Sequence, residues 1–134
     1  MKYNVRIDLE RTKRYYVNNV LHREDGPAVE YANGDKFWYK NGQLHREDGP
    51  AIEYSNGDKL WYKNGLRHRE DRPAVERKGS CLWYKNGKLH REDGPAALYT
   101  NGMKFWALND IEYGNTNDFT NESWAKFVKT LIFS

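Results

Sequence analysis

The chain repeats itself with a period of 23 residues, and this repetition constrains its fold more than any other feature. One copy reads LHREDGPAVEYANGDKFWYKNGQ, and the next reads LHREDGPAIEYSNGDKLWYKNGL. A third copy is one residue shorter, and a fourth follows it. Copies one to four span residues 21–43, 44–66, 67–88 and 89–110. Because a repeated sequence forms a repeated unit that packs on its neighbours, we expect a tandem array.

Each full copy carries two turn signals, YANGD and YKNG in the first copy. Asn-Gly favours a two-residue type I′ turn, in which both central residues have positive φ. Two such turns per copy predict a mainly β fold, a twisted antiparallel meander of roughly eight to ten strands.

The turns also predict which residues oppose each other. Two-residue turns place Val29 opposite Trp38, Tyr39 opposite Leu44 and Trp38 opposite His45. One face is then expected to carry Val29, Trp38 and His45, and the other Ala28, Phe37, Tyr39 and Leu44. With 5 Trp, 10 Tyr and 5 Phe against a mean hydropathy of −1.04, aromatic residues on both faces favour a single-layer ribbon.

The array is expected to occupy residues 1–113 and to be followed by a linker and an amphipathic helix in residues 114–134. Its hairpins are predicted to start near Arg11, Asp35, Asp58, Ser80 and Met103. The segment Tyr15 to Asn19 aligns with WYKNG, so the array begins before the first complete copy.

The C-terminal segment has the pattern of a short helix. Thr120 is a good N-cap, and Glu122 lies near the positive end of the helix dipole. Apolar residues then recur at helical spacing, namely Trp124, Phe127, Val128, Leu131 and Ile132. A helix this short needs a docking surface. It is expected either to cap the last hairpin or to mediate dimerisation or partner docking.

The order of aromatic strand, Asn-Gly turn and return strand resembles the MORN repeat. The LHREDGPA string resembles a variant of that repeat found in bacterial and bacteriophage proteins, and the resemblance covers residues 11–110. It implies a twisted β-hairpin meander without catalytic residues that is used for protein or lipid contacts. Several positions depart from the pattern, including Asn19, Arg67, Arg72 and Asp110. Such departures reflect either drift or a functional surface.

The HRED motif recurs in all four copies and contains residue types that bind metals or catalyse proton transfer. Equivalent positions lie two strands apart, about 9–10 Å, which is too far for two imidazoles on one zinc ion. Catalytic residues also take distinct roles, whereas this motif is copied. We therefore expect HRED to be structural, with Arg and the carboxylates of neighbouring copies forming a charge ladder; ligand contact is the alternative.

Charge and cysteine content set weak limits on location. The formal net charge is +3 and the sequence pI is about 8.9, which permits but does not demand nucleic-acid contact. Cys81 is the single cysteine, which fits a reducing cytosol, and we expect it to be a packed strand residue. No apolar run has the length of a signal peptide or a transmembrane segment. A cytoplasmic protein is expected.

These observations predict a non-enzymatic binding module with no cofactor and no metal. The expected partner is a protein, and the phage-type resemblance suggests a small accessory protein that blocks a host defence factor or toxin. Trp and Arg dominate binding hot spots. The predicted contact residues are Trp38, Trp61, Trp83, Arg46, Arg69 and Arg72.

Two alternatives to a protein partner are also compatible with the sequence. Aromatic residues interleaved with Lys and Arg would suit a nucleotide or nucleic acid, for example a sequestered signalling nucleotide. Self-association through the C-terminal helix or a sheet edge is the other.

Overall fold

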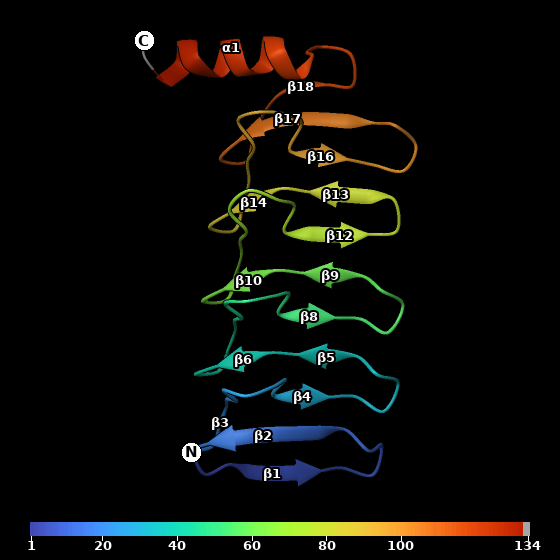
Figure 1. The fold of residues 1–134 in the computed structure, drawn as a ribbon, viewed down its shortest axis with the longest axis vertical. Coiled ribbons are helices and arrows are strands. Elements are labelled where there is room, and N and C mark those ends of the chain that lie inside the picture. Colours follow the sequence, from blue (N-terminus) through green and yellow to red (C-terminus); the bar gives the residue numbers. More distant parts are fainter. Residues whose placement is uncertain (133–134) are drawn as a thin grey trace. The chain divides into compact units, whose positions relative to one another are not determined.

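A computed structural model describes residues 1–132, which form 18 β-strands and one α-helix (Figure 1). The chain divides into two compact units, residues 1–67 and residues 68–134. The expectation of a mainly β antiparallel meander followed by a C-terminal helix is confirmed.

The first unit contains strands β1 to β11. Their bounds are β1 (Asn4–Ile7), β2 (Lys13–Val17), β3 (Val20–Leu21), β4 (Val29–Glu30), β5 (Lys36–Phe37), β6 (Tyr39–Lys40), β7 (Gln43–Leu44), β8 (Ile52–Glu53), β9 (Lys59–Leu60), β10 (Tyr62–Lys63) and β11 (Leu66–Arg67). The main sheet has the order β1-β2-β4-β5-β8-β9, and β3 pairs with β2. Strands β6–β7 and β10–β11 form separate two-stranded ladders. Strand β1, which the repeat pattern does not predict, pairs with β2 along its whole length.

The second unit contains the remaining strands and the helix. Their bounds are β12 (Val75–Arg77), β13 (Ser80–Leu82), β14 (Tyr84–Lys85), β15 (Lys88–Leu89), β16 (Ala97–Leu98), β17 (Lys104–Leu108), β18 (Ile111–Asn115) and α1 (Asn121–Ile132). The main sheet has the order β12-β13-β16-β17-β18, and β14 pairs with β15. Cys81 lies in β13 as predicted, and burial raises the pKa of its thiol. Within residues 1–132 there is no helix with the length and apolar character that a bilayer crossing requires.

The predicted strand count is wrong, because the long strands of copies one to three are interrupted. Trp38, Trp61 and Trp83 each separate two short strands, and the HREDGP segment divides the return side of the hairpin. The N–H of Trp38 donates to the Ala51 carbonyl at 2.7 Å, and its carbonyl accepts from the His45 N–H at 3.1 Å. Trp38 therefore stands where the chain changes partner, from the next hairpin of the main sheet to its own β6–β7 ladder. The same two bonds recur at Trp83, with Ala96 and His90.

The two Asn-Gly signals form different turns. Asn41 and Gly42 have φ of 51° and 79°, and Tyr39 pairs with Leu44 as predicted. At the other end Val29 pairs with Phe37 rather than with Trp38, because the loop there has three residues. Gly34 has φ of 99° and donates to the Tyr31 carbonyl, and Tyr31 N–H bonds to Asp35, the usual form of a three-residue hairpin loop.

This extra loop residue changes the predicted faces of the sheet. In the first unit, one face carries Val29, Phe37, Ile52 and Leu60 as opposed neighbours. The other face carries Glu30, Lys36, Glu53 and Lys59 in the same order. The main sheet thus has one apolar and one charged face, and the expectation of two aromatic faces was wrong. The buried residues on the apolar side include Val29, Ile52 and Leu60.

The helix caps the last hairpin, as one of the two expectations held. Thr120 Oγ1 accepts from the Ser123 N–H at 3.0 Å, which confirms the N-cap. Trp124 and Val128 pack with Trp106 of β17 in a buried cluster. Leu131, expected on the apolar face, is 40% exposed, and the Ile132 side chain lies outside the described part of the chain. Strand β18 continues to Asn115, two residues past the expected end of the array.

Candidate binding surface

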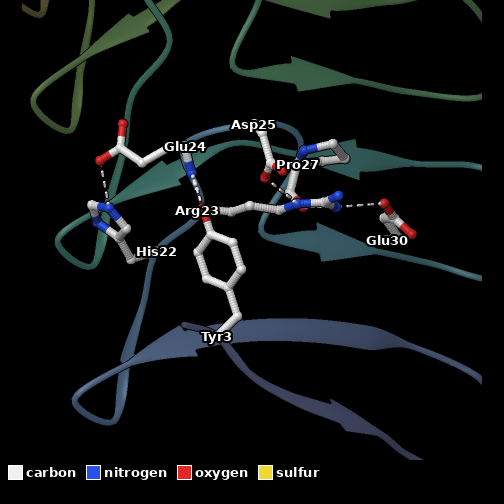
Figure 2. Close-up of polar contacts among 7 residues, drawn as sticks. All are labelled: Tyr3, His22, Arg23, Glu24, Asp25, Pro27 and Glu30. Atoms are coloured by element: carbon white, nitrogen blue, oxygen red, sulfur yellow. Dashed lines mark hydrogen bonds and ion pairs between the residues drawn. The ribbon is translucent and has the colours of Figure 1, made fainter. Parts of the chain in front are cut away.

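Each HRED motif follows the return strand of a type I′ turn and ties that turn to a later one. His22 Nε2 lies 2.7 Å from Glu24 Oε1, and its Nδ1 accepts from the backbone N–H of Asn41 at 2.9 Å. Figure 2 shows the contact between His22 and Glu24. His45 makes equivalent bonds to Glu47 and Asn64. The motif therefore connects successive hairpins through the backbone of the next turn.

These contacts show which ring nitrogen of His22 carries the proton. A backbone N–H only donates, so Nδ1 of His22 must carry a lone pair and the proton must lie on Nε2. The His45 side chain is 8% exposed, and its hydrogen bond lowers the pKa of Glu47. Both ring nitrogens are thus occupied by the scaffold. In His90 the Nδ1 bond to the Asn109 N–H is kept, and Glu92 is 4.0 Å away.

The arginine of the motif is enclosed by its own copy. Arg23 donates through Nε to Asp25 at 3.0 Å, and through one terminal nitrogen to the Pro27 carbonyl and to Glu30. Figure 2 shows this fan of bonds, with Glu24 N–H donating to the Tyr3 hydroxyl beside it. The Arg23 bond lowers the pKa of Asp25. The expected charge ladder between neighbouring copies was wrong, because Asp25 and Glu30 belong to the same copy as Arg23.

Each of these guanidinium groups also covers an aromatic ring. The Arg46 Cζ lies 3.9 Å from the centre of the Trp38 ring, and Arg91 covers Trp83 at the same distance. Arg23 covers Tyr15 in the same way. A stacked cation contributes roughly 0.5–2 kcal/mol depending on desolvation. One face of each ring is therefore already used inside the protein.

The glycine of the DGP sequence makes room for the arginine. A Cβ at Gly49 would lie 2.8 Å from Arg46 Cζ, and one at Gly94 would lie 2.5 Å from Arg91 Cζ. Copy three has Arg72 at this position. Its Arg69 keeps the bonds to the Pro73 carbonyl and to Glu76. The scaffold thus accommodates the departure from glycine in copy three.

A groove lies beside the HRED loops in each unit. In the first unit it measures about 570 Å³, and in the second about 330 Å³. Both grooves have the same kinds of wall, a half-buried Trp, a Lys and the acidic residues of two successive motifs. In the first unit these are Trp38, Lys40, Glu24, Asp25, Glu47 and Asp48. The carboxylates there are exposed, with Asp48 at 89%.

The structure separates the predicted contact residues into two groups. Trp38, Trp61 and Trp83 are half-buried rather than exposed, and Arg46 and Arg69 belong to the HRED scaffold. Arg72 alone among the six is exposed. Because Arg69 donates to the Pro73 carbonyl and to Glu76, its replacement is expected to disturb the fold, whereas replacement of Arg72 is not.

The sequence did contain a signal for the arginine scaffold. Copies one to three each place Glu seven residues after the HRED arginine, and these pairs form ion pairs of 2.9–3.1 Å. Such repeated Arg and Glu spacing indicates an internal pair. Within the described residues, the His, Cys, Asp and Glu side chains form no group of three or more placed to hold a metal ion.

No family model matches the chain, and no curated protein matches it.

Proposed function

We propose that this chain is a non-enzymatic binding module, a repeat scaffold that engages a protein partner through its exposed loops and turns. The observation that carries the proposal is the repeated use of HRED inside the scaffold. His45 forms hydrogen bonds with Glu47 and the Asn64 backbone. Arg46 donates to the Pro50 carbonyl and to Glu53. A motif engaged in this way supports the shape of the array, and the exposed residues around it remain for contacts.

The resemblance to MORN-variant repeats extends the proposal. Repeats of this kind imply protein or lipid contacts, and the phage-type LHREDGPA string favours a host protein, such as a defence factor or toxin, as the partner. A cytoplasmic partner is the expectation that accompanies it.

Nucleic-acid binding has weaker support. Base stacking needs an accessible ring face, but Arg46 already covers one face of Trp38. The groove beside Trp38 also exposes carboxylates, including Asp25 at 71% and Glu47 at 66%, which repel phosphate groups.

Affinity capture with the full-length chain tests the proposal. The tagged protein is expressed in the native host, and its partners are identified by mass spectrometry and then reconstituted from purified components. We expect one protein to bind with a definite stoichiometry by isothermal titration calorimetry. Its affinity is expected to fall only modestly with salt.

Two outcomes would contradict the proposal. Recovery of nucleic acid whose affinity falls in log salt with a slope near −1 per phosphate contact would favour the alternative. Turnover of a co-purifying small molecule by the purified chain would show that it is an enzyme.

A further inference from the structure

Positive charge is concentrated in copy three. Copies one and two each contain three basic and four acidic residues, and copy four contains two basic and three acidic residues. Copy three contains seven basic and three acidic residues. Three copies are therefore slightly acidic, whereas the third is strongly basic.

The excess comes from positions where copy three departs from the others. Arg72 stands where the other copies have Gly, and Arg77 stands where they have Tyr. Lys78 replaces a small residue, and Lys88 replaces Gln43 of copy one and Leu66 of copy two. All four side chains are exposed, and none forms an ion pair or side-chain hydrogen bond with another residue in the range 1–132.

The scaffold of copy three is kept despite these changes. Ala74 and Val75 are 0% and 3% exposed, as are Ala28 and Val29 in copy one. His68 still binds Glu70 and the Asn86 N–H. The four cations are thus additions that the fold tolerates and that make no ion pair within residues 1–132. A partner of opposite charge would supply the ion pairs that the fold itself does not provide.

We propose that the exposed cations of copy three dock an acidic segment of the partner protein. Arg77 and Lys78 lie at one turn of its hairpin, Lys88 lies beside the other turn, and Arg72 directly follows the HRED motif. This inference rests on the proposed function and adds the chemistry of the partner. Arginine binds carboxylates through paired hydrogen bonds, so Asp and Glu side chains suit the two arginines.

An acidic protein segment suits these cations better than a nucleic acid does. Arg77 occupies the position at which Tyr31 and Tyr99 are 38% and 39% exposed. Copy three has therefore exchanged a ring that could stack on a base for a cation. Glu70 is 69% exposed and lies two residues before Arg72, where it would repel a continuous phosphate backbone.

Reversion of copy three to the pattern of its neighbours provides the test. The variant Arg72→Gly, Arg77→Tyr, Lys78→Ser, Lys88→Gln introduces residues that other copies already carry at these positions. A matched control removes four exposed lysines elsewhere, with Lys2→Gln, Lys36→Gln, Lys59→Gln and Lys129→Gln. The probe is a fluorescent peptide containing six glutamates, measured by anisotropy at low salt beside a single-stranded DNA of equal charge.

We expect the reverted variant to bind the peptide about tenfold more weakly than the wild type, while the control changes by less than about twofold. An equal loss in the control, no binding by the wild type, or tighter and equally sensitive binding of the DNA would each overturn the inference. If the reverted variant is unstable, Arg72→Gly alone serves as the second variant, with a smaller loss expected. An unchanged affinity of Arg72→Gly would overturn the inference.

Different experimental outcomes would contradict the acidic-segment proposal and the proposed binding function. A captured protein partner that binds the reverted variant as tightly as the wild type would overturn the inference and leave the function standing. The absence of any reconstituted protein partner would overturn the function, whatever the peptide result.

Discussion

The two ends of each hairpin use the same Asn-Gly dipeptide in different ways. In KNG, Asn64 has φ of 51° and Gly65 has φ of 81°, so both are left-handed. In YSNGD, Gly57 alone is left-handed, with φ of 98°, and the Asn56 side chain accepts from the Asp58 N–H. The aspartate side chain is not the cause, because in copy four the Met103 N–H donates to Asn101 in the same way and Gly102 has φ of 87°. A dipeptide therefore sets a turn only together with its flanks.

The ends also differ in how they are joined to the next hairpin. At the KNG end a largely buried imidazole of His45 accepts from the Asn64 backbone. At the other end the more exposed carboxylate of Asp35 accepts from the Ser55 N–H at 2.7 Å. Loss of a largely buried ring that bonds through both nitrogens is expected to cost more than loss of a solvated carboxylate, whose bond water can replace. The histidine end is therefore expected to hold the greater share of the stability.

Removal of His45 should have the largest effect. His45→Ala leaves the Asn64 N–H without its acceptor and opens a void beside Trp38, so it should lower the free energy of unfolding by about 2–3 kcal/mol. Urea denaturation followed by tryptophan fluorescence measures this change. If His45→Ala lowers the free energy of unfolding by less than Asp35→Asn does, the aspartate end contributes more to stability than the histidine end.

Glycine replacements distinguish the turn geometries. Asn19 and Asp110 occupy the left-handed position of Gly65 with φ of 64° and 68°, so Gly65→Asn should cost less than about 0.5 kcal/mol. Gly57→Asn should cost about 1–2 kcal/mol, because φ near 98° lies outside the range that asparagine adopts readily. Equal melting temperatures for the two variants would show that the turns are alike after all.

Acid should weaken the histidine end before the aspartate end. Burial lowers the pKa of His90 below its usual 6.5, against the opposing influence of Glu92. The folded state then binds fewer protons than the unfolded state, so this contribution is complete above pH 6.5 and is lost as the pH falls through the folded pKa. Wild-type stability should fall by up to about 1 kcal/mol between pH 7.5 and 5.5, and His90→Gln should show a smaller fall. Identical pH profiles would refute a role for His90.

The aspartate end should respond last and least. The Ser55 N–H lowers the pKa of Asp35 below 3.8, so its contribution is present above pH 3.8 and is lost as the pH falls through the lowered value. Asp35→Asn keeps an acceptor oxygen, and we expect a small change in denaturation midpoint at pH 7 that disappears below pH 3. A change that persists in acid would show that geometry rather than charge matters there.

Local rules of sequence predicted one half of each hairpin correctly. The turn at Asn41 and Gly42, the pairing of Tyr39 with Leu44 and the cap at Thr120 follow from a few adjacent residues. The three-residue loop at Gly34 shifted the register on the other side, because two loop lengths share the same dipeptide.

The candidate surface was harder to predict because its key contacts join distant residues. Stacking of Arg46 on Trp38 depends on the crossing of the chain at Trp38, and neither residue shows this in its own neighbourhood. The sequence alone therefore could not distinguish the exposed Arg72 from Arg69, which donates to Pro73 and Glu76 inside the scaffold.

The bonds from His22 to Asn41 and from His45 to Asn64 have the same form, and each spans 19 residues. Every such tie joins one turn to the turn of the following hairpin. Insertion or deletion of a 23-residue segment consequently supplies or removes one donor together with one acceptor. Duplication or loss of one whole copy, such as residues 44–66, would then change the length of the array in whole steps, without leaving a mismatched bond at the junction. Length is thus a trait that selection can adjust in this protein separately from the chemistry of any one copy.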